Sequence, residues 1–432
     1  MTLSSNIAWR AGAPTLLSIN NYHYRRGGAD VVFFEQNRML QELNWNVASF
    51  SMHHPENIDS SWSKYFVDEI EFGHEYSVWQ KLVQAQKVIY SFEARRKLNS
   101  LINDANPQVA HIHNIYHHIS PSILGLLKKR GIPTVLTLHD LKLACPAYKM
   151  LAHDGICERC KPKKTFNVIV NKCIKGSVPL SALVYLESLV HQILRSYNNV
   201  SRFIVPSRFY LEKMVEWGWD RSRFSYIPNF VDCEQYQPSH MAGKPFVFFG
   251  RLSHEKGVHT LIKAAAMANV PVHIAGTGPE EQALKELAVQ TGANVSFMGY
   301  HTGEDLYNIV RNARAVVLPS EWYENAPISV MEAYALGRPV LGANIGGIPE
   351  LIRIGETGDV FISGSVEDLA SKLVQYTNLP DDDLVEMGRQ GRAWIKSEFS
   401  ASKYRDRLLE VYADIGGPAT ARYSEDGSHT PA

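Results

Sequence analysis

The sequence predicts an α/β protein built from two doubly wound, Rossmann-like domains. A chain of 432 residues is longer than one domain usually is. Between residues 245 and 342, short apolar runs alternate with segments that have helical periodicity, and strand–helix pairs occur in the first half as well. Such alternation implies parallel sheets covered on both faces by helices. We expect an N-terminal domain over residues 13–225, a C-terminal domain over residues 244–398, and a cleft between them.

Composition and charge narrow the class of protein. The hydrophobic content is 45% and the charged content 20%, as in soluble globular proteins. Basic and acidic residues both number 44, and this zero net charge argues against bulk electrostatic binding to nucleic acid. We find neither a signal-peptide pattern nor an apolar run near the ~20 residues that a membrane span needs. The expected location is the cytoplasm, without a nucleic-acid partner.

The N-terminal domain is predicted from apolar strands followed by helices. The strands are expected at residues 14–20, 46–52, 107–114, 131–140 and 203–207, and the helices at residues 29–43, 77–105 and 208–217. Residues 227–243 have the composition of a linker.

Several residues of this domain follow strand ends, where α/β proteins bind ligands. Gly27 and Gly28 separate the first strand from the first helix. They form either a plain turn or a loop bordering the cleft, near the sugar or phosphate of a ligand. His113 and Asn114 end the third strand and are expected to line a polar cleft. His139 ends the next strand, where it either donates to a substrate hydroxyl or is a buried structural histidine.

A cysteine-rich insertion follows at residues 145–173. Its spacing is Cys-x11-Cys-x2-Cys-x12-Cys, formed by Cys145, Cys157, Cys160 and Cys173. A Cys-x2-Cys knuckle with two further thiolates is typical of a structural zinc site, and four reduced thiols in a mobile loop are the alternative. The insertion is basic and precedes an amphipathic helix at residues 178–197. That helix either packs on the core or joins the basic loop in touching anionic lipid headgroups.

The C-terminal domain repeats strand and helix, and a tail completes the chain. The strands are expected at residues 245–252, 271–275, 295–298, 315–318 and 339–342, and the helices at residues 257–268, 280–290, 304–313 and 328–336. A last helix at residues 399–415 is expected to pack back on the N-terminal domain, before a disordered tail at residues 416–432.

The stretch at residues 320–332 joins a strand to a helix and carries the clearest chemical signal. Pro327 suits the first position of the helix, so Glu324 lies on the preceding turn and Glu332 inside the helix. Backbone N–H groups at a helix start favour phosphate, and the two carboxylates can accept hydrogen bonds from hydroxyls. Arg251 and Lys256, after another strand, can neutralise a diphosphate. These features together describe a nucleotide-sugar site.

The second half resembles the retaining GT-B glycosyltransferases of family four, also called glycosyl transferases group one. The matching motifs are Gly250-Arg-Leu with Lys256-Gly257, Ala275-Gly-Thr-Gly-Pro279, Gly299-Tyr300, Leu318-Pro-Ser320, the pair Glu324 and Glu332, Gly337-Arg-Pro-Val340, and Gly346-Gly-Ile-Pro-Glu350. The first half matches more loosely, through Gly27-Gly28, His111-Ile-His-Asn114 and His139-Asp140. The cysteine insertion is similar to that of polysaccharide-assembling bacterial members, which implies a glycan or lipid-linked acceptor.

The resemblance implies a role for each matching residue. Arg251 and Lys256 would hold the donor diphosphate, Glu332 the ribose, and Glu324 would lie near the transferred sugar. His139 would reach the donor from the N-terminal domain. The rest of the donor site would comprise Gly27, Gly28, Gly250, Gly276, Gly278, Asn325, Ala326, Pro327 and Ile328. The step Asn325-Ala326-Pro327 departs from the family's usual aromatic-glycine pair, so a different sugar could fit.

The implied reaction is hexosyl transfer from a nucleoside-diphosphate sugar with retention of anomeric configuration. It proceeds by front-face attack and needs neither a dedicated nucleophile nor a divalent metal. The Asp-rich run at residues 381–383 is interpreted as a cap before a helix. A GT-B-fold protein that binds nucleotide sugars without turnover is the alternative. A dinucleotide-dependent oxidoreductase is disfavoured, because no Gly-x-Gly-x-x-Gly follows the first strand.

Overall fold

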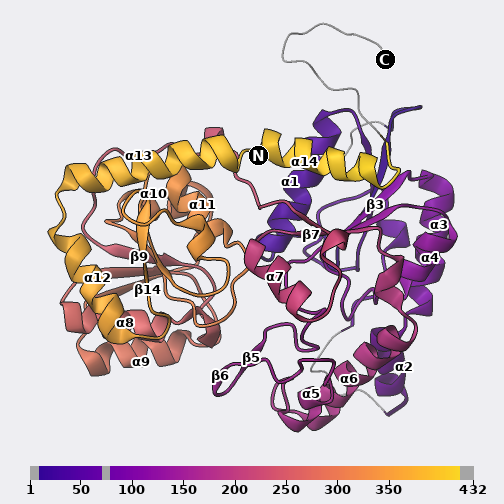
Figure 1. Ribbon diagram of the computed structural model, residues 1–432, viewed down its shortest axis with the longest axis horizontal. Coiled ribbons are helices and arrows are strands. Elements are labelled where there is room, and N and C mark those ends of the chain that lie inside the picture. The colour runs from indigo at the N-terminus through magenta and orange to yellow at the C-terminus, as the bar shows by residue number, and fades with distance from the viewer. Residues whose placement is uncertain (1–8, 71–77, 419–432) are drawn as a thin grey trace, which may run out of the picture.

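The computed structural model describes residues 9–70 and 78–418 and contains two parallel six-stranded sheets, one in each half of the chain (Figure 1). The predicted disordered tail therefore lies outside the described residues from residue 419 onward. The first sheet has the order β2-β1-β3-β4-β7-β8. Its strands are β1 (Thr15–Ile19), β2 (Asn46–Phe50), β3 (Val109–Ile112), β4 (Thr134–Thr137), β7 (Arg202–Val205) and β8 (Phe224–Tyr226).

The second sheet has the order β11-β10-β9-β12-β13-β14, so the strand order reverses between β9 and β12. This is the strand order 3-2-1-4-5-6 of a dinucleotide-binding fold. Its strands are β9 (Phe246–Phe249), β10 (Val272–Ala275), β11 (Val295–Gly299), β12 (Val316–Leu318), β13 (Val340–Ala343) and β14 (Gly358–Phe361). Two doubly wound α/β domains are thus confirmed.

Helices cover both faces of each sheet. In the N-terminal half they are α1 (Gly28–Glu42), α2 (Val78–Ile89), α3 (Phe92–Ala105), α4 (Ile123–Lys129), α5 (Asn167–Val170), α6 (Val178–Ile193) and α7 (Arg208–Glu216). In the C-terminal half they are α8 (Val258–Ala268), α9 (Glu281–Thr291), α10 (Gly303–Arg311), α11 (Ile328–Ala335), α12 (Val366–Asn378), α13 (Asp381–Glu398) and α14 (Ala401–Asp414).

Alternate strand residues enter different cores, as expected for strands buried on both sides. In β9, Phe246 and Phe248 belong to one cluster of buried side chains and Val247 to another. In β1, Leu17 and Ile19 pack into one core, while Leu16 packs into a second core with α14. The apolar runs therefore form strands because both of their faces are buried.

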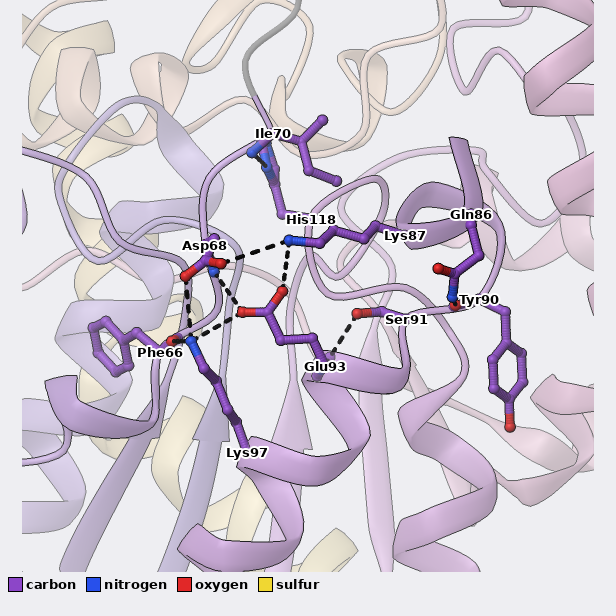
Figure 2. Close-up of polar contacts among 11 residues, drawn as sticks. Phe66, Asp68, Ile70, Gln86, Lys87, Tyr90, Ser91, Glu93, Lys97 and His118 are labelled. Carbon is purple, nitrogen blue, oxygen red and sulfur yellow. Dashed lines mark hydrogen bonds and ion pairs between the residues drawn. The ribbon is translucent and has the colours of Figure 1, made fainter. Parts of the chain in front are cut away.

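The predicted single helix over residues 77–105 is wrong in one respect: it is two helices, and Ser77 lies outside the described residues. Ser91 is extended, and its hydroxyl accepts a hydrogen bond from the backbone N–H of Ala94, which starts α3. Figure 2 shows Lys87 of α2 and Lys97 of α3 both pointing at Glu93. Burial alone would raise the pKa of Glu93, but hydrogen bonds from these lysines and from the N–H of Asp68 lower it to about 2. A serine cap and an ion-pair cluster therefore define the break.

The interpretation of the aspartates at residues 381–383 also changes. They form the first turn of α13 itself, and Pro380 occupies the cap position. Carboxylates in a first turn stabilise a helix through its dipole rather than by capping it. Asp381 also forms an ion pair of 3.0 Å with Arg314.

The chain ends by crossing back to the first domain. Figure 1 shows α13 running along the C-terminal domain and α14 continuing over the N-terminal domain beside α1. The hydroxyl of Tyr412 lies 2.7 Å from Nδ1 of His111, and that of Tyr404 donates to Gln36 at 2.9 Å. The last helix is therefore part of the N-terminal core.

None of the helices over residues 9–70 and 78–418 combines the length and apolarity of a membrane-spanning segment. The cysteine insertion contains the two-stranded hairpin β5 (Leu151–Ala152) and β6 (Gly155–Ile156), followed by the short helix α5.

Candidate active site

The site lies where the strand order of the second sheet reverses. Strands β9 and β12 are neighbours, and their carboxyl ends lead into residues 250–256 and 319–327. Ligands of open α/β sheets bind outside the carboxyl ends of strands at such a point. The topology thus brings together two loops that are distant in sequence, and each carries residues expected to be functional.

Lys256 and Glu324 form an ion pair at this point. The ammonium of Lys256 donates to Oε1 of Glu324 at 2.6 Å, and the hydroxyl of Ser320 donates to the same oxygen at 2.8 Å. The Glu324 side chain is only 8% exposed. Burial alone would raise the pKa of Glu324, but the charge and hydrogen bond of Lys256, with hydrogen bonds from Trp322 and Ser320, lower it below its usual range. Glu324 is therefore a carboxylate, and it is unsuited to act as a general acid.

Glu332 occupies a different setting, inside α11. Its Oε1 lies 3.4 Å from the hydroxyl of Tyr236, and burial raises its pKa. Pro327 holds the cap position of α11 with an extended ψ of 119°, one residue before the position expected from the sequence. The backbone N–H groups at the start of α11 therefore follow directly on the loop that carries Glu324.

Arg251 is exposed, and its side chain makes no hydrogen bond or ion pair with any residue that the structure describes. It follows Gly250, whose φ of +147° turns the chain out of β9. A side chain at Gly276 would lie 1.9 Å from the carbonyl oxygen of Gly250, and one at Gly278 2.2 Å from that of Leu252. These two glycines therefore let the loop after β10 pack directly on the backbone beside Arg251.

The Gly346-Gly347 pair has a supporting role that sequence reasoning did not specify. A side chain at Gly347 would lie 1.9 Å from the carbonyl oxygen of Asn325, and the N–H of Gly347 donates to the carbonyl of Glu324 at 2.8 Å. The loop after β13 therefore braces the backbone that presents Glu324.

His139 lies two residues past the end of β4 at Thr137. Its Nε2 lies 2.8 Å from Nδ1 of His113. Burial lowers the pKa of His139 to about 4, and burial with the neighbouring histidines lowers that of His113 well below its usual value. Both imidazoles are neutral near pH 7. The predicted polar-cleft position of His113 is wrong: its side chain is 1% exposed and packs edge-on against Phe33.

The loop at Gly27 and Gly28 meets the donor-side loop. A side chain at Gly28 would lie 3.4 Å from Cδ1 of Ile328, the first residue of α11. Asp30 holds this turn, because its carboxylate accepts hydrogen bonds from the N–H of Gly27 and of Arg26. The glycines thus lie where the two domains meet.

Asn325 joins the domains at the centre of the site. Its amide nitrogen donates to the carbonyl of Leu138, the residue before His139, at 2.9 Å. Its amide oxygen accepts from the hydroxyl of Ser207 at 2.8 Å. The neighbouring carbonyl of Ala326 accepts from Asn229 at 2.9 Å. Glu324 and His139 therefore lie on opposite sides of one closed interface.

The four cysteines of the insertion gather in one region. Burial and the other three cysteines raise the pKa of Cys160 to about 12, and burial with Cys145 and Cys157 raises that of Cys173 to about 11. All are free thiols. Within the ranges given above, no three His, Cys, Asp or Glu side chains are arranged to hold a metal ion. The four thiols therefore lie in one region but are not arranged as metal ligands, and a structural zinc stays a prediction from the spacing of the cysteines in the sequence.

Sequence reasoning missed the contacts of the insertion with the donor-side loops. Lys149 donates to Glu255 at 2.9 Å, and Tyr323 donates to Glu158 at 3.0 Å. Asp140 was named only as part of the His139-Asp140 motif, and burial raises its pKa from 3.8 to about 6. The adjacency of Glu255 to Lys256 and of Tyr323 to Glu324 is visible in the sequence, but their partners are distant along the chain.

Two family models match the chain and together cover residues 26–394 except residue 236. "Glycosyltransferase Family 4" matches residues 26–235, and "Glycosyl transferases group 1" matches residues 237–394. The boundary between the matches follows the last strand of the first sheet and precedes the first strand of the second.

Related sequences differ in how much of their length they share with this chain. An uncharacterised 42.6 kDa protein in the cps region of Klebsiella pneumoniae is 26% identical over 81% of this chain and 89% of its own length. A GDP-mannose-dependent monoacylated alpha-(1-6)-phosphatidylinositol monomannoside mannosyltransferase of Corynebacterium glutamicum is 29% identical over 48% of this chain and 60% of its own length. The O-antigen chain mannosyltransferase C of Escherichia coli is 37% identical over 39% and 46%.

Solved structures share the whole architecture. Sucrose-phosphate synthase from Thermosynechococcus elongatus superposes with a TM-score of 0.70 at 18% identity, covering 93% of this chain and 99% of the other. Anabaena HepE in complex with UDP and glucose gives 0.65 at 15% identity, covering 93% and 100%. At these identities the likeness establishes the GT-B fold.

Proposed function

Because this chain belongs to the group 1, family 4 glycosyltransferases of GT-B fold, we propose that it transfers a hexosyl unit from a nucleoside-diphosphate sugar to a glycan or lipid-linked acceptor, with retention of configuration. The donor class is supported by the relatives, one of which is described as GDP-mannose-dependent and another as a UDP complex. The proposed process is polysaccharide or glycoconjugate assembly, in line with relatives from a cps region and from O-antigen synthesis.

The observation that carries this proposal is the Lys256–Glu324 pair at the strand-order reversal, 2.6 Å across and beside the exposed Arg251. In the proposed reaction Lys256 and Arg251 neutralise the diphosphate as it leaves, together with the N–H groups at the start of α11. Glu324 orients the sugar hydroxyls, and Glu332 binds the ribose. Two cations at the diphosphate supply the charge stabilisation that a divalent metal would otherwise give, so we propose catalysis without one.

We propose front-face attack rather than a double displacement. A carboxylate held at 2.6 Å by an ammonium is a weak nucleophile and a poor proton donor. The leaving phosphate then takes the proton of the attacking acceptor hydroxyl. With Nδ1 of His113 donating to Nε2 of His139, the single N–H of neutral His139 is on Nδ1, from where it can donate a hydrogen bond to a sugar hydroxyl.

The proposed acceptor side is the N-terminal domain. The loop after β2 lines a cavity of about 550 Å³ with His53, His54, Asn57, Asp59 and neighbouring serines. Such a volume is within the range of small-molecule sites, and the hydroxyl-rich lining suits a glycan.

A lipid-linked acceptor is supported by the surface of the insertion and α6. Phe166, Val170 and Ile193 are 50%, 66% and 70% exposed. Phe166 and Val170 lie at the two ends of α5, and Ile193 ends α6, which packs beside α5 (Figure 1). The exposed lysines 163, 164, 172 and 175 precede and follow α5 in the insertion and its connection to α6. Apolar side chains flanked by lysines suit an anionic lipid surface. We propose peripheral contact with the inner membrane face.

We expect the protein to co-sediment with anionic vesicles but not with zwitterionic vesicles, and we expect salt to weaken this binding. Absence of binding to either kind of vesicle, or equal binding to both kinds, would refute the membrane contact.

We also retain, as a separate proposal, a structural zinc at the four cysteines. Its support is the Cys-x2-Cys spacing and the closeness of the four cysteines, since Cys145, Cys157 and Cys173 all act electrostatically on Cys160. Elemental analysis of protein purified without chelator should find one zinc per chain. Metal-free, folded protein would refute it.

The experiment for the main proposal is a donor panel. The protein is incubated with UDP-, GDP- and ADP-sugars and with glycan and lipid-linked acceptors, and released nucleoside diphosphate is measured. We expect release with one donor class that depends on an acceptor. Donor binding without release under any combination would instead support a nucleotide-sugar-binding protein without turnover.

A further inference from the structure

The cysteine insertion touches the C-terminal domain at two places, each one residue away from a member of the Lys256–Glu324 pair. We propose that Glu158 and Lys149 are positioning residues: through Tyr323 and Glu255 they hold Glu324 and Lys256 at their working separation. This inference rests on the proposed glycosyl transfer, because it assigns the insertion a part in that reaction.

The first tie holds Tyr323, the residue before Glu324. Its hydroxyl donates to Glu158 at 3.0 Å, and Lys213 of α7 donates to the same carboxylate oxygen at 2.8 Å. The Tyr323 ring packs on Phe209, with 4.8 Å between ring centroids. Its carbonyl accepts from Tyr210 at 3.1 Å. Every one of these partners belongs to the N-terminal half, so the position of Tyr323 depends on that half.

The second tie holds Glu255, the residue before Lys256. Lys149 donates to its carboxylate at 2.9 Å, and the Glu255 side chain is only 14% exposed. The carbonyl of Glu255 in turn accepts from the N–H of Glu321 at 2.9 Å. Displacement of Glu255 is therefore passed both to Lys256 and to the loop that carries Glu324.

The Glu158–Tyr323 and Lys149–Glu255 contacts are coupled, because both Glu158 and Lys149 belong to the same insertion. Lys149 precedes the hairpin β5–β6 and Glu158 follows it, and the N–H of Cys157 bonds to the carbonyl of Met150 at 2.8 Å. The hairpin thus fixes the separation of the two contacts. When the domains meet, Glu158 and Lys149 engage together and set the geometry of the catalytic pair.

The test compares Tyr323→Phe, Glu158→Ala and Lys149→Met with the parent enzyme and with Arg159→Gln. Arg159 is an exposed neighbour of Glu158, and its guanidinium donates to Asp154 and Asn171 of the same insertion. Misplaced catalytic groups reduce the rate of the chemical step more than they reduce ground-state binding. We expect kcat to fall roughly ten- to hundredfold in the three variants, with donor KM changed less than about threefold. Arg159→Gln should behave like the parent.

The variant that combines Tyr323→Phe with Glu158→Ala gives a further measurement, because it distinguishes loss of their mutual hydrogen bond from a general loss of fold. If Tyr323 and Glu158 act through their mutual bond, the double variant loses no more kcat than the worse single variant. The charge exchange Lys149→Glu with Glu255→Lys should restore part of the kcat lost in Lys149→Met. Single variants with parental kcat, or losses that multiply fully in the double variant, would overturn the inference.

The same variants separate this inference from the proposed function. A parent that releases no nucleoside diphosphate from any donor refutes the function. In that case, a crystal structure of the double variant still tests the inference: the Lys256–Glu324 separation should differ from the 2.6 Å of the parent chain. An unchanged separation would overturn the inference on its own.

Discussion

The Lys256–Glu324 pair joins opposite charges at 2.6 Å. In the proposed reaction, an arriving diphosphate competes for the ammonium of Lys256, and the carboxylate of Glu324 becomes available to sugar hydroxyls. The pair is therefore a preorganised polar environment whose parts separate in function once the donor binds.

Glu324→Gln tests this arrangement without changing its shape. The amide loses the negative charge but keeps the volume, so we expect kcat to fall by roughly a hundredfold or more while the fold persists. Kinetic assays with the donor found in the panel, and circular dichroism as a check of folding, make the measurement. Glu356→Gln, an exposed glutamate of the same domain, is the control and should keep parental kcat. More than half of parental activity in Glu324→Gln would contradict the assigned place.

Buried histidines give a second prediction, on stability against pH. Burial lowers the pKa of His23 and His139 from 6.5 to about 4, and burial with the charge of His139 lowers that of His111 to about 3. The unfolded chain binds their protons near pH 6.5 and the folded chain does not. The free energy of unfolding should therefore fall as pH drops from 6.5 towards 4, by up to roughly 1.4 kcal/mol per pH unit for each histidine.

Asp140, Asp30 and Glu332 act in the opposite sense, because burial raises the pKa of each carboxyl, but the histidines with lowered pKa values outnumber them. Urea unfolding across this pH range measures the slope. His23→Phe should flatten it, since that ring lies among Phe33, Phe34 and Phe66. Exposed His240→Asn should leave it unchanged. Constant stability from pH 6.5 to 4 would contradict the buried, neutral state of these histidines.

At the scale of elements, the loops are positioned by backbone packing that only glycine permits. The Gly346-Gly347 turn after β13 lies directly against Glu324 and Asn325. The motif is recognisable in the sequence, but its supporting role depends on the adjacency of β12 and β13.

Gly347→Ala should therefore disturb the site. The added carbon would lie 1.9 Å from the carbonyl oxygen of Asn325 and 2.9 Å from the side chain of Ser207, so the Glu324 loop must move. We expect a destabilisation of roughly 1–3 kcal/mol and a loss of kcat at least tenfold, from unfolding curves and assays.

Gly125→Ala is the matched control. Gly125 lies inside α4, and its added carbon would come no nearer than 3.7 Å to another group, so stability should stay level or rise by up to about 1 kcal/mol. Equal behaviour of the two variants would refute the bracing role of the loop.

An element could be predicted when the feature that forms it, such as a run of apolar residues, is visible within its own sequence. Strands such as β9 and β12 are apolar runs buried on both faces, and the sequence was sufficient to find them. The division between α2 and α3 was missed, because helical periodicity continues through Tyr90 and Ser91 while a serine cap ends it. Cap geometry is decided by backbone angles that apolar periodicity does not report.

On the whole-molecule scale, the candidate site forms only when both domains are present. Asn325 bonds to Leu138 and Ser207, and α14 returns to pack on β3 through Tyr412 and His111. The residues on each side of the cleft could be predicted from their places at strand ends. The contacts of Glu158 and Lys149 could not, because they arise from the docking of one domain on the other.

Retaining hexosyl transfer between the two domains is best tested by proton NMR of the anomeric position. The donor identified by the panel is followed during turnover with its acceptor. We expect the anomeric signal of the donor to be replaced by a product signal with the same class of one-bond carbon–proton coupling, hence the same anomeric configuration. A first-formed product with the opposite configuration, or a donor signal that persists unchanged with every acceptor, would contradict it.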